Sequence, residues 1–219
     1  MFDFYTAATP NGYKISIALE EMGFEYQLKR IDFSKKDQHA PEYLKISPNG
    51  KIPAIVDHDN GCFALAESGA ILVYLAEKCG KFYGHDDKSR YQILQWLMFQ
   101  MAGVGPMMGQ ANVFYRYMEE EIPTAIARYH NEVHRLFGVL EKQLEKTEFI
   151  AGDYSIADMA TYPWISINEW SGTPVDDFPQ IQRWMETIAA RPAVKIGMNT
   201  PPQADPSKII KSARKIMTR

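Results

Sequence analysis

The feature that most constrains the fold is a change of hydrophobic pattern at about residue 84. Before it, short alternating runs typical of β-strands take turns with helical runs, whereas after it apolar residues recur at helical spacing. The polar, turn-rich segment 84–88 between the two patterns is typical of a linker. Because 219 residues suffice for two modest domains, we predict an α/β domain over residues 1–82 and an all-helical bundle domain over residues 88–202.

The first pattern predicts seven elements in the order β-α-β-α-β-β-α. Strands are expected near 2–5, 26–31, 52–56 and 62–66, and helices from the turn at 9–12 to 22, near 41–46 and from 68 to 79. Asn60-Gly61 is expected to join the last two strands, because both residues tolerate the positive φ of a tight hairpin turn. Ser68 is expected to cap the last helix, and Gly80 to end it.

The second pattern predicts helices near 88–118, 122–146, 155–170, 178–190 and 192–198. Gly103, Gly105 and Pro106 are expected to bend or interrupt the first of these. Ser155 and Asp158 have the spacing of a capping box, in which each residue hydrogen-bonds the backbone N–H of the other. The tail at 203–219 is basic and carries Lys208, Lys211, Arg214, Lys215 and Arg219.

Composition excludes several functional classes. The net charge is -3, so no basic excess favours nucleic acid as a partner. Polar residues interrupt every apolar stretch before the ~18 residues of a membrane span, and the first residues lack the pattern of a signal peptide. The two cysteines, Cys62 and Cys79, form neither a disulfide framework nor a C-x-x-C motif. We therefore expect no metal, no membrane, and a reducing, cytoplasmic location.

The turn Thr9-Pro10-Asn11-Gly12 lies between the first strand and the first helix. Ligands of open α/β sheets collect at the carboxyl ends of strands, and the N–H groups of a helix start favour an anion. The turn is therefore a candidate anion site. Taken alone, it has a simpler interpretation, in which Thr9 or Asn11 is an N-cap.

Two further pairs in the first domain could bind a ligand. A cis bond at Ile52-Pro53 would turn the Ile52 backbone outward to pair with a peptide-like ligand, although an ordinary trans edge proline is the commoner case. At the start of the third helix, Ser68 could hold a carboxylate and Glu67 could accept from an ammonium group. As an isolated pair, Glu67-Ser68 is more often a helix cap.

Together these segments resemble the glutathione transferase family. The closest matches are S-P-N-G-K-I-P-A-I-V-D (47–57) and A-E-S-G-A-I-L-V-Y-L-A (66–76), and the S-I-A-D capping box recurs in the family's second domain. The segments T-A-A-T-P-N-G-Y-K-I (6–15) and Q-W-L-M-F-Q-M-A-G-V-G-P-M-M-G-Q (95–110) look most like the bacterial Nu class. The resemblance implies a thioredoxin-like domain, a helical bundle, glutathione as cosubstrate, a homodimer, and mainly glutathione-dependent disulfide reduction.

The resemblance also implies a role for each site residue. Asn11 and Thr9 would hold the glutathione sulfur, and Ile52 would bind the cysteinyl backbone through a cis Pro53. Glu67 and Ser68 would bind the γ-glutamyl end of glutathione, and Gln38 would contact its glycyl end. Arg128 would reach the ligand from the helical domain. Without the resemblance, Arg128 would be interpreted as a surface ion pair with Glu132.

The turn at 9–12 occupies the place where glutaredoxins carry a Cys-Pro-x-Cys site, and both cysteines are replaced here. Glutathione must therefore supply the thiol. Lowering a thiol pKa from about 8.5 to about 6.5 takes roughly 2.7 kcal/mol. A helix N-terminus supplies about 0.3–1 kcal/mol, up to ~2 when partly buried. A hydrogen bond to the charged group supplies about 1.5–3 kcal/mol. Acting together, the helix start and a donor from Thr9 or Asn11 suffice.

Some alternatives stay open. Tyr5 is a rival for the sulfur contact, although it also continues the strand pattern and so favours packing. Cys62, on a strand, and Cys79, at a helix end, are interpreted as structural thiols. An acceptor pocket between the domains could be walled by Met107, Met108, Phe114, Tyr115 and Trp164, or these residues could be plain core. The acceptor would be a small disulfide or, alternatively, an electrophile conjugated to glutathione, and a non-catalytic binding module is the third possibility.

Overall fold

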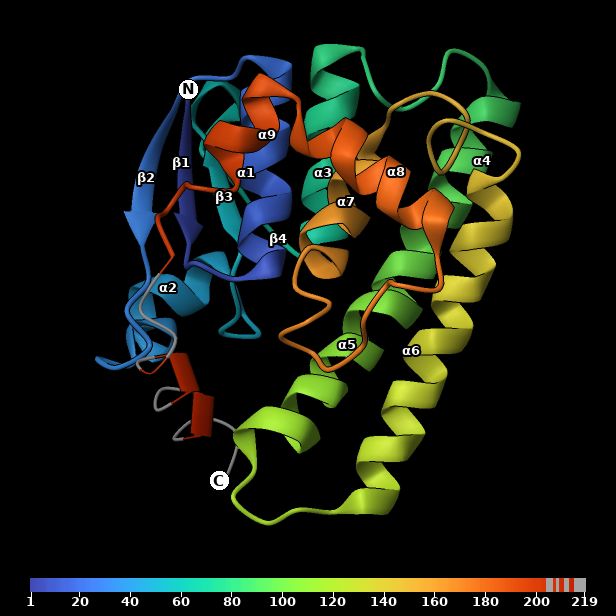
Figure 1. Ribbon diagram of the computed structural model, residues 1–219. Coiled ribbons are helices and arrows are strands. Elements are labelled where there is room, and N and C mark those ends of the chain that lie inside the picture. The colour runs from blue at the N-terminus through green and yellow to red at the C-terminus, as the bar shows by residue number, and fades with distance from the viewer. Residues whose placement is uncertain (204–206, 208, 211–212, 215–219) are drawn as a thin grey trace.

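A computed structural model describes residues 1–203, 207, 209–210 and 213–214 and shows two adjoining parts (Figure 1). The first contains a four-stranded mixed sheet in the order β2-β1-β3-β4. Its strands are β1 (Phe2–Thr6), β2 (Tyr26–Arg30), β3 (Ala54–Asp57) and β4 (Phe63–Ala66). β1 runs parallel to β2 and antiparallel to β3, which pairs antiparallel with β4. The predicted thioredoxin-like order is confirmed.

Helix α1 (Pro10–Met22) joins β1 to β2 and is largely buried. Pro10 begins it and Thr9 caps it, while Gly23, at φ 68°, ends it in the left-handed conformation that glycine adopts freely. Its residues 12–19 are all buried, because α1 packs against α3, α7 and α9 and also lies beside the sheet (Figure 1). The shorter helices are α2 (Pro41–Ile46), η1 (Asp37–His39) and η2 (His58–Asn60).

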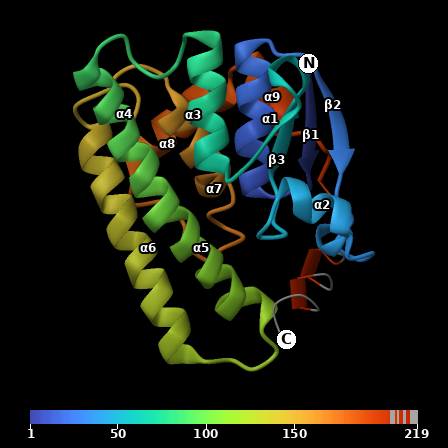
Figure 2. The ribbon, with the colours of Figure 1, turned by 180° about the vertical axis from the view of Figure 1, so that it is seen from behind.

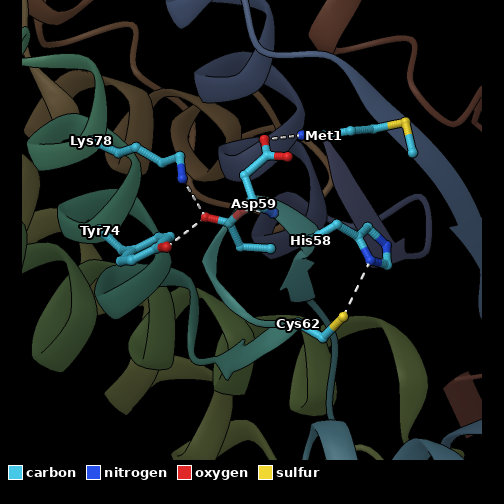
Figure 3. Close-up of polar contacts among 7 residues, drawn as sticks. Met1, His58, Asp59, Cys62, Tyr74 and Lys78 are labelled. Atoms are coloured by element: carbon cyan, nitrogen blue, oxygen red, sulfur yellow. Dashed lines mark hydrogen bonds and ion pairs between the residues drawn. The ribbon is translucent and has the colours of Figure 1, made fainter.

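Helix α3 (Ser68–Cys79) is tied to the end of β3 by Asp57. The Asp57 carboxylate is fully buried and accepts hydrogen bonds from the Tyr74 hydroxyl and the Lys78 ammonium, both at 2.6 Å (Figure 3). Burial alone would raise the pKa of Asp57, but the hydrogen bonds from Lys78 and Tyr74 outweigh it and lower the pKa. This contact holds α3 in a fixed position on the hairpin.

The second part is helical, as predicted. Its α-helices are α4 (Asp87–Phe99), α5 (Gly105–Asn112), α6 (Pro123–Leu144), α7 (Ile156–Ile165), α8 (Pro179–Ala189) and α9 (Pro192–Gly197). Figure 2 shows α6 beside α4 and α5 along the outer side of this part, and α5 packs directly on α6. One hydrophobic core runs through both parts, because α1 and α3 pack on α7.

The predicted interruption of the first long helix is confirmed. Between α4 and α5 the chain forms the π-helical segment η3 (Gln100–Val104), and a second one, η4 (Val113–Tyr117), follows α5. Pro106 has no N–H to donate to the carbonyl four residues earlier, so regular α-helical bonding cannot pass through it. The interruption brings Gln100 and Met101 toward the first part of the chain.

Several predicted boundaries are wrong by a few residues. Helix α7 ends at Ile165 rather than near 170, because Asn168 donates its side-chain N–H to the Ile165 carbonyl and the chain then turns. Positive φ falls on Gly61 and Cys62, not on Asn60 and Gly61, because residues 58–60 form a 3-10 turn. Cys62 is therefore an exposed turn residue rather than part of a strand. Glu67, not Ser68, is the N-cap of α3.

The capping box at the start of α7 is confirmed and reaches further than predicted. The buried Asp158 carboxylate accepts from the Ser155 N–H at 3.0 Å and also from the Ile150 N–H and the Trp184 indole N–H. Burial raises the pKa of Asp158 to about 6. Of the predicted basic tail, Lys208, Lys211, Lys215 and Arg219 lie outside the described residues, whereas Arg214 donates to the Tyr117 carbonyl. In the described part of the chain no helix is long and apolar enough to span a membrane.

Candidate active site

A cavity of about 250 Å³ opens where the starts of α1 and α3 approach the turn before β3. It brings together five of the predicted site residues, namely Asn11, Ile52, Pro53, Glu67 and Ser68. The sequence motif around residue 50 adds Ser47, Asn49 and Lys51, and Ala66 and Met101 complete the lining. Met101 comes from η3, so the helical part contributes to the wall.

Asn11 lies in the first turn of α1 and is oriented by the helical part. Its Oδ1 accepts a hydrogen bond of 2.9 Å from the indole N–H of Trp164, on α7. An indole N–H only donates, so the atom that faces it must be the amide oxygen. The Asn11 NH₂ group is consequently directed elsewhere, and it has no hydrogen-bond acceptor among the described residues. Asn11 therefore offers a donor beside the cavity.

Thr9 acts as the N-cap of α1, which was the simpler interpretation of this turn. Its Oγ1 accepts from the Gly12 N–H at 3.3 Å. Since the oxygen is the acceptor in this bond, the Thr9 O–H remains able to donate. Thr9 is not among the residues that line the cavity.

The backbone around Ile52 is held from one side and open on the other. The Tyr43 hydroxyl and the Ser47 hydroxyl both donate to the Lys51 carbonyl, at 2.6 Å and 2.8 Å. The Ile52–Pro53 peptide bond is cis, as the resemblance implied. Ile52 precedes β3, so its N–H and C=O take no part in strand pairing. These groups can pair with the backbone of a peptide-like ligand.

The start of α3 supplies another part of the cavity lining, with Glu67 and Ser68. Glu67 has a φ of 72° and no side chain caps the helix, so the first N–H groups of α3 remain available to an anion. The Glu67 side chain is exposed, whereas Ser68 is buried. The arrangement places an exposed carboxylate next to an anion-binding helix start, which suits a ligand group that carries both an ammonium and a carboxylate.

Lys14 lies behind this end of the cavity and was not predicted as a site residue. Its ammonium donates to Gln100 Oε1 at 2.6 Å, to Ser68 Oγ at 3.3 Å and to Met101 Sδ at 3.3 Å. Burial lowers the pKa of Lys14 to about 7, and the negative charge of Glu67 opposes the shift. The side chain therefore contacts two residues of the cavity wall, Ser68 and Met101.

The comparison with family models shows to which proteins the chain is related. Family models for the N-terminal and the C-terminal domain of glutathione S-transferase match residues 2–77 and 103–192. This chain belongs to the glutathione S-transferase family. The expected family is thereby confirmed, together with its fold.

The similar proteins are named for glutathione or disulfide chemistry. The disulfide-bond oxidoreductase YfcG of Escherichia coli is 48% identical over 200 residues, which cover 88% of this chain and 92% of that protein. A glutathione transferase of Pseudomonas putida, solved with one glutathione disulfide bound per subunit, is 43% identical with a TM-score of 0.86, and 91% of each chain is covered. A family member from Pseudomonas fluorescens pf-5, solved with two glutathione bound, is 46% identical with a TM-score of 0.84, and the match covers 90% of this chain and 92% of that chain.

Besides Thr9, two predicted site residues of this transferase-family chain do not line the cavity. Gln38 is buried and its Oε1 has no hydrogen-bond partner in the described part of the chain. Arg128 is exposed on α6, and the close ion pair of Glu132 is with Arg135, whereas Arg128 acts on Glu132 only through a weaker electrostatic interaction. The roles of Gln38 and Arg128 stay predictions.

The structure also bears on the roles that the sequence left open for Tyr5 and for the five residues proposed as pocket walls. The ring of Tyr5 packs on Tyr43 with ring centres 5.8 Å apart, and Tyr5 does not line the cavity, which supports the packing role. None of the five residues proposed as acceptor-pocket walls lines the cavity either. Met108 and Trp164 are core residues, and Phe114 stacks on Tyr129. In the described ranges no cluster of three or more acidic, histidine or cysteine side chains could hold a metal ion.

Sequence reasoning missed Lys14 and the true contact of Trp164. A weak signal for Lys14 exists, because it precedes Ala18 by four residues and so falls on a face of α1 predicted to be apolar. A lysine on such a face needs a buried partner. The hydrogen bond between Trp164 and Asn11 joins residues 153 positions apart, so no local sequence pattern predicts it.

Proposed function

We propose that this protein is a glutathione-dependent disulfide reductase that uses the thiolate of bound glutathione. The observation that carries the proposal is the start of α1, where the Asn11 amide is oriented by Trp164 and no cysteine is present. The related oxidoreductase YfcG and the relative solved with glutathione disulfide support the same chemistry.

The reaction is a pair of thiol–disulfide exchanges. The glutathione thiolate attacks one sulfur of a small disulfide, a bond forms between these two sulfurs, and the original S–S bond breaks. The other half leaves as a thiolate and takes up a proton. A second glutathione thiolate then attacks the mixed disulfide, which releases the second half as a thiol and leaves oxidised glutathione. Two glutathione molecules are oxidised for each disulfide reduced.

The cavity suits glutathione in one orientation. Its sulfur would lie at Asn11, with the hydroxyl of the helix cap Thr9 as the predicted second donor, and its cysteinyl backbone would pair with Ile52 beside Pro53. Its γ-glutamyl carboxylate would lie at Ser68 and the first N–H groups of α3, with the ammonium at Glu67. Gln38 and Arg128 remain the predicted contacts to the glycyl end and from the helical domain. A thiolate at Asn11 also lies at the N-terminus of α1, where the helix dipole stabilises it.

A coupled assay tests the proposal. The purified protein is incubated with glutathione and a small hydroxyalkyl disulfide, and oxidised glutathione is followed with glutathione reductase. We expect turnover well above the uncatalysed exchange. A rate equal to the uncatalysed rate would overturn the proposal.

Two further measurements, of conjugation to an electrophile and of glutathione binding, separate the two alternatives. A conjugating transferase would turn over a chlorinated or isothiocyanate acceptor, and Tyr5→Phe would be more damaging than Asn11→Ala. A non-catalytic module would bind glutathione without turnover of either substrate class.

We also propose a cytoplasmic homodimer. Cys62 and Cys79 are free thiols, and the reaction needs reduced glutathione, so both favour a reducing compartment. Large apolar side chains are exposed on β4 and α4, namely Phe63, Tyr91 and Met98, and a second subunit could cover them. Sedimentation analysis tests the dimer, since a single species of about 25 kDa would exclude it.

A further inference from the structure

Lys14 is a buried cation without a buried counter-ion. Its exposed fraction is 1%, its ammonium forms no ion pair with the described acidic side chains, and the exposed carboxylate of Glu67 acts on its charge only from a distance. All three of its hydrogen-bond acceptors are neutral, namely Gln100 Oε1, Ser68 Oγ and Met101 Sδ. A buried lysine is costly unless its charge is compensated, so this position has a reason beyond filling space.

The geometry indicates where a compensating charge would come from. Ser68 and Met101 contact the Lys14 ammonium on one side and line the cavity on the other. The ammonium therefore stands one side chain behind the cavity wall, at the end formed by the start of α3. An anion placed at Ser68 would lie close enough to interact with the buried charge through a medium that screens it weakly.

The hydrogen bond from Lys14 also decides what the Ser68 hydroxyl can do. A hydroxyl has one proton, and the ammonium can only donate, so Ser68 Oγ is the acceptor in the 3.3 Å contact. The Ser68 proton is then available to other acceptors. Met101 Sδ, a weak acceptor 3.6 Å away, is the competing partner among the described residues. A carboxylate in the cavity is the stronger acceptor.

We propose that Lys14 is a positioning residue for the carboxylate of the γ-glutamyl group: it orients the Ser68 hydroxyl toward the cavity and supplies the positive charge that attracts the carboxylate. The inference rests on the proposed function, because glutathione is the ligand it concerns. Lys14 acts through Ser68 and does not itself contact the ligand.

A purely structural role is the competing explanation. Lys14 joins α1 to α3 and η3 through its three acceptors, and it could serve only to hold the two domains together. Such a role would affect folding and every ligand equally. The positioning role instead affects ligands according to whether they carry the γ-glutamyl carboxylate.

The test measures binding by titration calorimetry with two ligands. One is glutathione, and the other is its analogue in which hydrogen replaces the α-carboxylate of the γ-glutamyl group. Lys14→Met is expected to weaken glutathione binding by about 10–100-fold and to change analogue binding less than about threefold. Lys14→Gln, which can still donate to Ser68 but has no charge, is expected to fall between Lys14→Met and the unmodified protein. Lys45→Met, at an exposed lysine paired with Glu42 on α2, is the matched control and is expected to change neither affinity.

A second variant covers the case in which Lys14 variants fail to fold. Gln100→Glu keeps the side-chain size but places a carboxylate at the atom 2.6 Å from the ammonium. This competing anion is expected to weaken binding of glutathione more than tenfold and that of the analogue much less.

The outcomes are distinguishable. If the unmodified protein does not bind glutathione, the proposed function fails together with its ligand. If it binds glutathione but Lys14→Met or Gln100→Glu lowers the affinity for both ligands equally, or for neither, the positioning role of Lys14 is wrong and the proposed function stands.

Discussion

The two ends of the cavity have a similar architecture, but different chemical groups hold their cavity-lining residues in place. Each is the start of a helix in the thioredoxin-like domain, α1 at Asn11 and α3 at Ser68, and each has a cavity residue held by a buried side chain. At Asn11 the holding group is the neutral indole of Trp164, from the helical domain. At Ser68 it is the ammonium of Lys14.

The difference matches the anion that each end would receive. A carboxylate is ionised at all physiological pH values, so a nearby cation can compensate its charge, and the bound carboxylate in turn favours the charged form of Lys14. A thiol becomes an anion only when it reacts, and its nucleophilicity falls as its pKa falls. A neutral donor and a helix dipole lower the thiol pKa moderately, whereas a full charge in contact would lower it further and make a weaker nucleophile. Changes near Asn11 should therefore alter rate and its pH dependence, and changes near Ser68 should alter affinity.

Asn11→Ala is expected to have the largest effect on rate. Loss of a hydrogen bond to a charged group, about 1.5–3 kcal/mol, lowers kcat/KM for disulfide reduction by about 10–100-fold. Because the donor stabilises the thiolate, its loss raises the pKa of the bound thiol, so the deficit is larger at pH 7 than at pH 9. Rates measured from pH 6 to 9 check the shift.

The same experiment can contradict the comparison. If Asn11→Ala weakens glutathione binding while leaving kcat and the pH profile unchanged, Asn11 positions the ligand and does not stabilise its thiolate. Gln27→Ala, at an exposed position on β2, is the control, with no expected change.

Ser68→Ala is expected to have the opposite signature. It removes the hydroxyl between Lys14 and the cavity, and the loss of about 1–2 kcal/mol raises the dissociation constant of glutathione about 5–30-fold. At saturating glutathione, kcat and the pH profile should be unchanged. A fall in kcat at saturating glutathione, with unaltered affinity, would contradict the comparison, because it would show that the Ser68 end affects the rate rather than the binding of glutathione.

Trp164→Phe is a milder change at the sulfur end. It keeps most of the buried ring and removes the indole N–H that orients Asn11. We expect a decrease of about 3–10-fold in kcat/KM and a pH profile shifted in the same direction as in Asn11→Ala, but less. The shift is read from the same pH series.

Trp184→Phe is the matched control for Trp164→Phe. It also removes a buried indole N–H, but that group donates to Asp158, in the capping box of α7. Its expected effect is on thermal stability, with an unchanged pH profile. Equal pH shifts in the two variants would mean that Trp164 acts through stability rather than through Asn11.

Local patterns were enough to predict most of the fold. The alternation in β1, the spacing in α1 and the break at Pro106 predicted the elements, and the T-P-N-G, I-P and E-S motifs predicted five of the cavity residues. The errors lie where side chains compete with backbone patterns. Asn168 helps end α7 early, and the 3-10 turn at 58–60 moves the positive φ onto Cys62.

The parts that sequence could not predict are contacts between distant segments. Lys14 meets Gln100, and Asn11 meets Trp164, only after the helical domain has packed on α1. The sequence leaves Trp164 as either a pocket wall or a core residue, because an aromatic at helical spacing does not reveal the partner of its N–H. These contacts hold the cavity residues in place. The sequence therefore predicts which residues line the cavity better than it predicts which side chains hold those residues in position.

Thr9→Ala is expected to have the smallest effect of the series on kcat/KM and a measurable one on stability. Thr9 caps α1 by accepting from the Gly12 N–H, and losing an N-cap costs about 1 kcal/mol, or roughly 2–4 °C in Tm for a chain of this size. Because Asn11 and the helix dipole remain, kcat/KM should fall less than about fivefold. Thr9→Ser keeps both the cap and the O–H donor and should behave like the unmodified protein. A loss for Thr9→Ala as large as that for Asn11→Ala would move the main sulfur contact from the Asn11 amide to the Thr9 hydroxyl, and the sulfur end would then depend on the helix cap itself rather than on a residue held by the helical domain.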